Sequence, residues 1–410
     1  MPEKIIINGI VNEPLEIELN SSIYGGGEAE IYPLPRNDYL LKRYRDKLLT
    51  ETRKEKVLDF CSRYETFKSF LKIGQYALPE APAIEVTNDN IVGFAMRNMG
   101  KLPQILSFKF DDNDFQTYKG FKLNDYGAIE LIYNMYESLM QLHRANIILG
   151  DLNPTNILYD CDKKCPVFVD IDSAQLGKYS CYAYTQDYTD PIVEESGKNT
   201  DGSYVYNSNS DYFSLALICY ELFIGANPYF FSTKPPEFPE VQKMNRRCLI
   251  NFLEDKNYAN SIGMEFSFSH PINKKHIDRL KILESKDKVL YKYFSDTFCR
   301  DKRCNLLTQL PKDDKRNPCY TMYNKKKGPV KTIKEVLSEN LFTDNQDDNL
   351  NDQNKFNVID QSGMIDFLKY FKKEKIYNIN AKEMPNDTKA FMMFVDNLGL
   401  DYNNLITRGT

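Results

Sequence analysis

The sequence predicts an α+β fold with two lobes, in which a strand-rich first part is followed by a mainly helical second part. Apolar and polar residues alternate through much of the first hundred residues, whereas from Asn124 onward apolar residues recur at helical spacing. A polar turn containing Asp151 and Asn156 follows the helical segment at 124–144. A short apolar strand comes next and ends on Asp170-Ile171-Asp172. This turn and strand carry three oxygen-bearing side chains to one end of a β-hairpin.

Strands and one helix are expected in the first part. The alternating pattern predicts strands at residues 4–10, 15–19, 30–32, 39–42, 83–86 and 91–96. The glycine triplet Gly25-Gly26-Gly27 interrupts this region. Helical spacing of apolar residues over 50–70 predicts a helix, and Thr50 is placed to cap its N-terminus.

The second part is expected to be mainly helical. Apolar residues share one face over 124–144, a loop-rich stretch covers 173–210, and a strongly apolar helix follows at 211–224. Further helical segments extend to about residue 304. An acidic, amide-rich stretch near 344–349 is typical of a linker, and helical spacing returns at 363–371 and 381–398. We therefore expect an N-lobe at 1–99, a C-lobe at 100–310, a basic connecting segment at 311–344, and a linker with a helical C-terminal extension at 345–410.

Composition excludes several classes of protein. The 410 residues include 42% hydrophobic, 13% aromatic and 27% charged residues, as in a globular protein. A net charge of −5 argues against a protein that binds nucleic acid over its whole surface. The N-terminus lacks the apolar run of a signal peptide, and residues 213–226 are too few to cross a bilayer. Nine scattered cysteines favour reduced thiols in a cytoplasmic protein, because their spacings match neither a disulfide framework nor a zinc site.

The polar turn and the strand after it resemble the catalytic and metal-binding loops of protein kinases. Gly150-Asp151-Leu152-Asn153-Pro154-Thr155-Asn156 resembles the loop written H-R-D-x-x-x-x-N, and Asp170-Ile171-Asp172 resembles a variant of D-F-G. The resemblance covers roughly residues 18–310. It implies a bilobal protein-kinase-like fold that uses ATP and Mg²⁺, or Mn²⁺. Asp151 would accept or orient the proton of the substrate hydroxyl, Asn156 and Asp170 would hold the metal, and Asp172 would add a metal ligand or a hydrogen bond.

The resemblance also assigns nucleotide-binding residues. Residues 23–32 resemble the glycine-rich loop, whose glycines let backbone N–H groups approach the phosphates. Lys42 matches the catalytic lysine that pairs the α- and β-phosphates, and its partner would be Glu55 or, as the alternative, Glu51. The remaining expected contacts to the nucleotide are the phosphate-loop glycines, the residues that pack on or floor the adenine, and the hinge: Gly25, Gly26, Gly27, Ile31, Leu158, Met96, Arg97, Asn98 and Met99.

Residues 211–229 support the resemblance, because they look like the buried kinase helix that begins with an acid and ends in G-x-x-P-F. Asp211 would tie the backbone of the catalytic loop. Several positions depart from the usual pattern; in the catalytic loop, Leu149 and Gly150 replace H-R, and Asn153 replaces a lysine. Without that arginine, regulation by loop phosphorylation loses its usual partner.

Three functions remain open. The motifs look most like divergent microbial Ser/Thr-kinase-like proteins, which favours a protein substrate. Gly150 and Asp172 instead suit a small-molecule kinase of the aminoglycoside-phosphotransferase type. The third alternative is a pseudokinase that serves as a nucleotide sensor or scaffold, although Lys42, Asp151, Asn156 and Asp170 are all present.

Overall fold

The computed structural model describes residues 4–318, except 11–13, 20–21, 36–37, 112–113, 116, 119 and 313. Most of the expected basic segment 311–344, and all of the expected extension 345–410, lie outside the described residues. The chain divides into two compact units. The first holds Met1–Ser138 and Ile147–Gly225, and the second holds Leu139–Asn146 and Ala226–Thr410. The first unit therefore contains both the sheet and the polar turn with Asp151.

An antiparallel seven-stranded sheet forms the N-terminal part of the first unit, in the order β2-β1-β6-β7-β5-β4-β3. Six strands lie close to their expected positions, and the two-residue strand at Tyr24–Gly25 was not expected. The strands are β1 Lys4–Ile7, β2 Leu15–Glu18, β3 Tyr24–Gly25, β4 Ala29–Pro33, β5 Tyr39–Tyr44, β6 Ala81–Glu85 and β7 Ile91–Arg97. Glycine at position 93 lets β5 and β7 pair, because a Cβ there would lie 2.0 Å from the carbonyl oxygen of Lys42. This pairing fixes the register of the strand that carries Lys42, which lies opposite Phe94.

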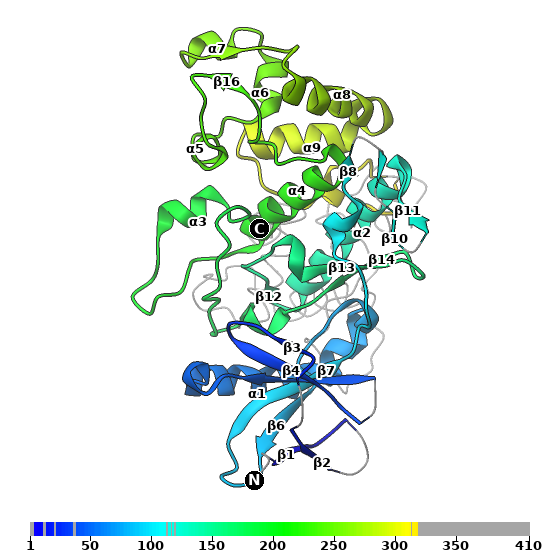
Figure 1. The fold of residues 1–410 in the computed structure, drawn as a ribbon, viewed down its shortest axis with the longest axis vertical. Helices are drawn as coiled ribbons and strands as arrows, with labels where there is room; N and C mark the ends of the chain where they lie inside the picture. Colours follow the sequence, from blue (N-terminus) through cyan, green and yellow to red (C-terminus); the bar gives the residue numbers. More distant parts are fainter. Residues whose placement is uncertain are drawn as a thin grey trace, which may run out of the picture. The chain divides into compact units, whose positions relative to one another are not determined.

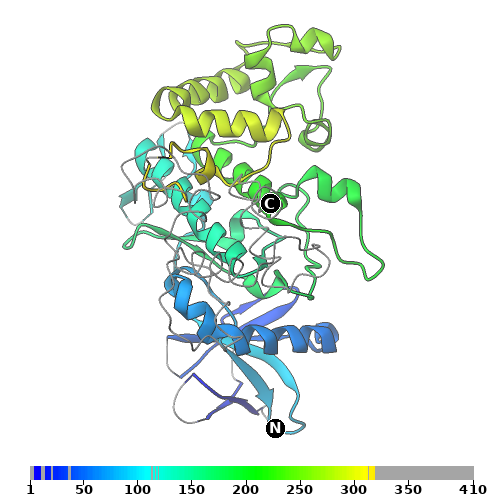
Figure 2. The same ribbon diagram turned by 180° about the vertical axis from the view of Figure 1, so that it is seen from behind.

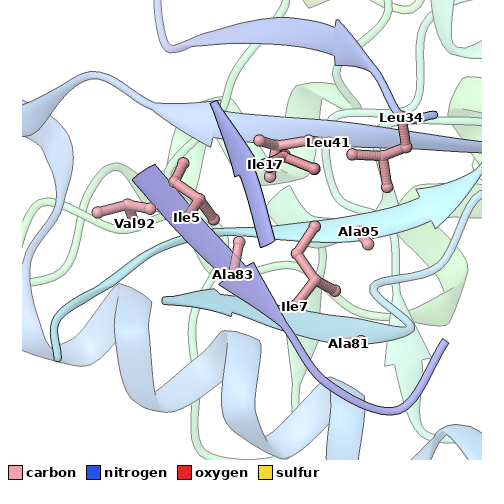
Figure 3. Packing of buried hydrophobic residues seen from close by; sticks show 9 residues of the cluster. All are labelled: Ile5, Ile7, Ile17, Leu34, Leu41, Ala81, Ala83, Val92 and Ala95. Carbon is pink, nitrogen blue, oxygen red and sulfur yellow. The ribbon is translucent and has the colours of Figure 1, made fainter. Parts of the chain in front are cut away.

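One face of the sheet holds a hydrophobic cluster to which five strands contribute. Figure 3 shows its side chains, which are Ile5, Ile7, Ile17, Leu34, Leu41, Ala81, Ala83, Val92 and Ala95. Ile5, Ile7 and Leu41 are fully buried. Burying a side chain of this size contributes about 1.5–3 kcal/mol. Apolar side chains of β1 and β5 are therefore buried in this cluster, which anchors β5, the strand that carries Lys42.

Helix α1, Glu51–Phe70, packs against β6 and β7 of the sheet (Figures 1 and 2). The expected cap is confirmed, since the Thr50 side chain accepts a hydrogen bond of 3.2 Å from the backbone N–H of Arg53. Val57, Phe60 and Phe67 are buried on the face toward the sheet. The short helix η1, Asp46–Leu48, joins β5 to α1.

The remainder of the first unit consists of short elements around two longer helices. Helix α4, Ser208–Ile224, begins three residues before Asp211, because Asn207 and Ser210 form a capping box. It ends at Gly225, the C-cap residue, whose φ of +91° lies in the left-handed region. The loop-rich stretch 173–210 contains one further helix, α3. The other elements are η2 Ile73–Gln75, η3 Ile105–Phe108, β8 Phe110–Asp111, β9 Asp114–Phe115, β10 Thr117–Tyr118, β11 Phe121–Lys122, β12 Ile147–Ile148, η4 Pro154–Asn156, β13 Ile157–Asp160, β14 Cys165–Phe168, η5 Ile171–Ser173, β15 Gln175–Leu176 and α3 Pro191–Ser196. Helix α2, Asp125–Arg144, belongs to the first unit up to Ser138 and to the second unit from Leu139.

The second unit is helical, as expected. Helices α8, Pro271–Lys286, and α9, Lys288–Cys299, lie side by side (Figure 2). Its other elements are β16 Thr233–Lys234, α5 Pro239–Met244, α6 Leu249–Glu254, α7 Tyr258–Ser261, β17 Glu265–Phe266 and η6 Leu306–Gln309. Across the part of the chain that is described, no helix combines the length and the apolar character needed to span a membrane. The described residues thus have the α+β fold that the sequence predicts.

Candidate active site

The loop between β12 and β13 is built around the buried side chain of Asp211. Its two carboxylate oxygens accept hydrogen bonds of 2.8 Å each from the backbone N–H groups of Leu149 and Gly150. Asp211 is fully buried, so removing it would leave two buried N–H groups without this acceptor. The prediction that Asp211 ties the backbone of this loop is confirmed.

Gly150 occupies a position that only glycine fits. Its φ is +70°, in the left-handed region. A Cβ at this position would lie 2.8 Å from Cδ2 of Tyr206 and 2.9 Å from Sγ of Cys181. These two side chains belong to a buried cluster with Ile148 and Val193. Backbone conformation and packing therefore explain why glycine replaces the usual arginine.

The carboxylate of Asp151 holds a hydroxyl group. Thr185 donates its Oγ1 hydrogen to Oδ1 of Asp151 at 2.6 Å, and Asn153 Nδ2 lies 3.4 Å from Oδ2. Burial raises the pKa of Asp151, while these two hydrogen bonds oppose that shift. A carboxylate with a raised pKa is a better proton acceptor than one at its usual value. Asp151 can thus accept a proton from a hydroxyl placed beside it.

Asn156 and Asp170 lie at the same end of the β13–β14 hairpin, since Asn156 precedes β13 and Asp170 follows β14. Asn156 lies at the end of η4, just before β13, and its Nδ2 donates to the carbonyl oxygen of Asp151 at 3.2 Å. Its Oδ1 has a long contact of 3.5 Å with Thr155 Oγ1. Asp170 follows β14 and has a side chain 43% exposed. An amide oxygen and a partly exposed carboxylate are hard ligands suited to Mg²⁺.

The Asp170-Ile171-Asp172 motif and β5 meet at the side chain of Lys42. Its ammonium group donates to Asp170 and, at 2.7 Å, to Oδ1 of Asp172. The other oxygen of Asp172 accepts from the hydroxyl of Tyr44 at 2.6 Å. Burial disfavours the charged form of Lys42, but the charges of Asp172 and Asp170 outweigh it and raise the pKa of this lysine. The structure therefore brings together Lys42, Asp170 and Asp172, residues 128 and 130 positions apart in the chain.

Lys42 and Glu55 are not brought together. The side chain of Glu55 is 58% exposed and pairs with Lys178 at 3.5 Å. Glu51, the alternative, pairs with Lys54 at 2.7 Å. Helix α1 presents Lys56, not a glutamate, on its buried face. Since successive helical residues differ by about 100° in direction, one step along the sequence separates the exposed Glu55 from the buried Lys56.

The buried Lys56 joins α1 to the segment after the metal motif. Its Nζ donates to the carbonyl oxygens of Ser173 at 3.0 Å and Ser180 at 3.4 Å. Burial lowers the pKa of Lys56 to about 8. Lys56 therefore links helix α1 to this segment through hydrogen bonds to two backbone carbonyl oxygens.

The expected nucleotide-binding residues lie in β3, β4, β7 and the segment after β7. The turn between β3 and β4 contains Gly26 and Gly27, and the backbone N–H of Gly26 donates to Ala29 at 2.9 Å. Ile31 and Leu158 are half-buried. In the hinge, the backbone N–H of Asn98 donates to the carbonyl oxygen of Asp38 at 2.8 Å. In the sheet Gly25 lies opposite Glu30, and Met96 lies opposite Leu40. Arg97 donates a 3.4 Å hydrogen bond to the Tyr64 hydroxyl, and Met99 is half-buried.

Sequence reasoning missed the roles of Tyr44, Lys56 and Thr185. Tyr44 stands two residues after Lys42 on the same strand, and a period of two places both on one face. Lys56 stands four residues before the buried Phe60, so it interrupts an apolar stripe, which is a detectable signal. Thr185 carries no such signal, because only the folded loop brings it to Asp151.

A magnesium ion at this site would need few protein ligands. The described residues contain no group of three or more His, Cys, Asp or Glu side chains placed to hold a metal. Mg²⁺ usually takes one or two carboxylates and completes its shell with phosphate and water, so this finding fits an ion held together with a nucleotide. Asn156 and Asp170 supply the donor types that such an ion requires.

Comparisons with known proteins agree with this geometry. Residues 89–292 match the protein kinase domain family, and the match includes the loop of Asp151 and helix α4 but begins after Lys42. Over 104 residues the chain is 34% identical to an Aurora kinase of Yarrowia lipolytica, covering 25% of this chain and 26% of the relative. Over 144 residues it is 28% identical to protein kinase C-like 1 of Caenorhabditis elegans, covering 31% and 19%.

A third relative is the putative protein kinase C delta type homolog of Drosophila melanogaster, 28% identical over 157 residues, or 35% of this chain and 22% of the relative. The chain thus spans about a fifth to a quarter of the length of these relatives. The family match, the α+β fold and the pairing of Lys42 with the acids of the metal motif agree with one another. Residues 89–292 of this chain therefore form a protein-kinase-like domain.

Proposed function

We propose that this protein transfers the γ-phosphoryl group of ATP to a hydroxyl group, most consistently a serine or threonine hydroxyl of a protein. The observation that carries this proposal is the 2.6 Å hydrogen bond from the Thr185 hydroxyl to Asp151. This contact supports the proposal, because the Asp151 carboxylate already accepts a hydrogen bond from an aliphatic hydroxyl. A threonine in a protein substrate would present the same group.

In the proposed reaction, Asp151 orients the acceptor hydroxyl and takes its proton. The hydroxyl oxygen forms a bond to the γ-phosphorus, the bond from that phosphorus to the bridging oxygen breaks, and ADP leaves with the electron pair. Lys42 holds the α- and β-phosphates through its charge. Asn156 and Asp170 would hold Mg²⁺, which supplies positive charge to the phosphate oxygens when bound.

Two observations bear on the acceptor. Gly150 and Asp172 suggested a small-molecule acceptor, but the left-handed backbone and packing account for Gly150 without reference to any substrate. Asn153 and Thr185 surround Asp151 with groups suited to a hydroxyl acceptor. These groups would suit a sugar hydroxyl equally, so our preference for a protein acceptor rests on the similarity to protein kinases, and an aminoglycoside or sugar is the second candidate.

Radiolabelled ATP with Mg²⁺ tests the proposal on the full chain. Acceptors would be a set of generic protein substrates, aminoglycosides and sugars, and product would be measured for wild type, Asp151→Ala and Asp170→Ala. Asp162→Ala serves as the matched control, because Asp162 is exposed in the β13–β14 turn. Removing a general base or a metal ligand should lower the rate by about 10²–10⁴-fold, while the control retains it. Nucleotide binding without transfer to any acceptor would instead indicate a pseudokinase.

A further inference from the structure

Two acids of the metal motif have different surroundings. The side chain of Asp170 is 43% exposed and accepts a hydrogen bond from Lys42. Asp172 has a side chain only 5% exposed, and each of its two oxygens accepts a hydrogen bond, one from Lys42 and one from Tyr44. Asp170 can therefore turn toward a cation at the surface of the site. Asp172 would have to give up a buried hydrogen bond to do so, which costs about 1–3 kcal/mol.

Helix α1 does not supply the acid that Lys42 requires. Glu55 is exposed and pairs with Lys178, so its charge is used away from Lys42. The buried residue at the next position is Lys56, whose Nζ donates to the backbone carbonyl oxygens of Ser173 and Ser180. The acids that Lys42 contacts are Asp170 and Asp172. A buried lysine needs an anion beside it, because uncompensated buried charge is strongly unfavourable.

Tyr44 fixes the orientation of this carboxylate. It is buried, with 1% of its surface exposed, and it comes from the same strand as Lys42. Its ring also lies beside Phe94 on β7, with ring centroids 5.9 Å apart. Lys42 and Tyr44, which both donate hydrogen bonds to Asp172, are therefore positioned by the sheet.

We propose that Asp172 is the positioning residue for Lys42, replacing the glutamate that helix α1 would have supplied, and that Asp170 and Asn156 hold the metal without it. This inference rests on the proposed function, since it assigns the anchor of the lysine that holds the phosphates. When Asp170 turns to a bound cation, Asp172 remains as the acid that keeps Lys42 in place. The second acid of the motif is thus a structural partner of the lysine rather than a metal ligand.

Binding of a fluorescent ADP analogue, measured with and without Mg²⁺, separates these roles and needs no acceptor. For Asp172→Asn we expect the affinity in the absence of Mg²⁺ to fall about tenfold, the effect of one hydrogen bond to a charged group. The Mg²⁺ concentration at half-maximal binding should stay within about twofold, since this variant leaves the proposed metal ligands in place. Asp170→Asn should raise the Mg²⁺ requirement; it also removes a hydrogen bond to Lys42, but from a more exposed acid, so its loss of Mg²⁺-free affinity should be smaller than that of Asp172→Asn.

An exposed acid provides the matched control. Asp162→Asn, in the β13–β14 turn, should change neither quantity. If Asp172→Asn fails to fold, as judged by circular dichroism, Tyr44→Phe replaces it; we then expect a weaker Mg²⁺-free affinity, by about threefold, with an unchanged Mg²⁺ requirement.

Two results would overturn the inference. One is an Asp172→Asn variant that binds as wild type does without Mg²⁺ but needs more Mg²⁺, which would make Asp172 a metal ligand. The other is a folded variant, Asp172→Asn or Tyr44→Phe, with no change in either quantity. A wild-type protein that binds the nucleotide but transfers nothing would contradict the proposed function and leave this test intact. A wild-type protein that binds no nucleotide would contradict both.

Discussion

Gly150 offers the sharpest test of how the loop before Asp151 is built. Its φ of +70° is costly for a residue with a side chain, by about 1–2 kcal/mol. The new Cβ of Gly150→Ala would also lie 2.8 Å from Tyr206 and 2.9 Å from Cys181, and overpacking of this kind costs about 1–3 kcal/mol. We therefore expect Gly150→Ala to lower the free energy of unfolding by about 2–5 kcal/mol, the sum of these two terms.

Two other glycines separate the causes. Gly177 has a φ of +54° but nothing within 4 Å of its added Cβ, so Gly177→Ala should cost only the backbone strain, about 1–2 kcal/mol. Gly74 has neither a positive φ nor a close neighbour, and Gly74→Ala should be neutral or slightly stabilising, by at most about 1 kcal/mol. Urea unfolding of the three variants measures these differences. A cost for Gly150→Ala no larger than that for Gly177→Ala would refute the packing argument.

Two further predictions concern buried ionisable groups. Asp211→Ala should destabilise the protein by about 2–6 kcal/mol, since two buried N–H groups lose their acceptor, and Asp211→Asn should cost less; urea unfolding that ranks them the other way would contradict this. Burial, assisted by the neighbouring Lys275, lowers the pKa of His276 to about 4 from its ordinary 6.5. As the pH falls, the unfolded chain therefore binds a proton at this histidine before the folded chain does. The stability that the neutral His276 contributes is complete above pH 6.5 and is lost as the pH falls toward 4. The loss should total about 3 kcal/mol, and His276→Gln should lack it when unfolding is measured between pH 7 and 4.

Much of the fold could be predicted from local pattern. Alternation placed the strands that carry Lys42 and the hinge, and apolar spacing placed α1 and α4. The start of α4 was missed by three residues, because the capping box of Asn207 with Ser210 extends the helix before its apolar run begins. The two-residue strands β8–β11 were not predicted, since segments so short carry no measurable period.

Motif spacing proposed the residues of the candidate site but not how they pair. Motif spacing identified Lys42, Asp151 and Asp170, and the order of elements placed Asp211 under the loop. The choice between Glu55 and Glu51 was open because helix spacing fixes relative directions, not which face is buried. The exposed stripe turned out to contain both, and the pairing of Lys42 with Asp172 depends on contacts between residues 130 positions apart.

The most direct measurement of the central claim compares binding with chemistry in Asp151→Asn. This variant keeps the size of the side chain but removes the carboxylate that accepts the hydroxyl proton. We expect its affinity for the fluorescent ADP analogue to stay within about threefold of wild type, while the single-turnover rate of phosphoryl transfer from ATP falls about 10²–10⁴-fold. A variant that transfers phosphate at the wild-type rate would contradict the assignment of Asp151 as the proton acceptor and orienting group.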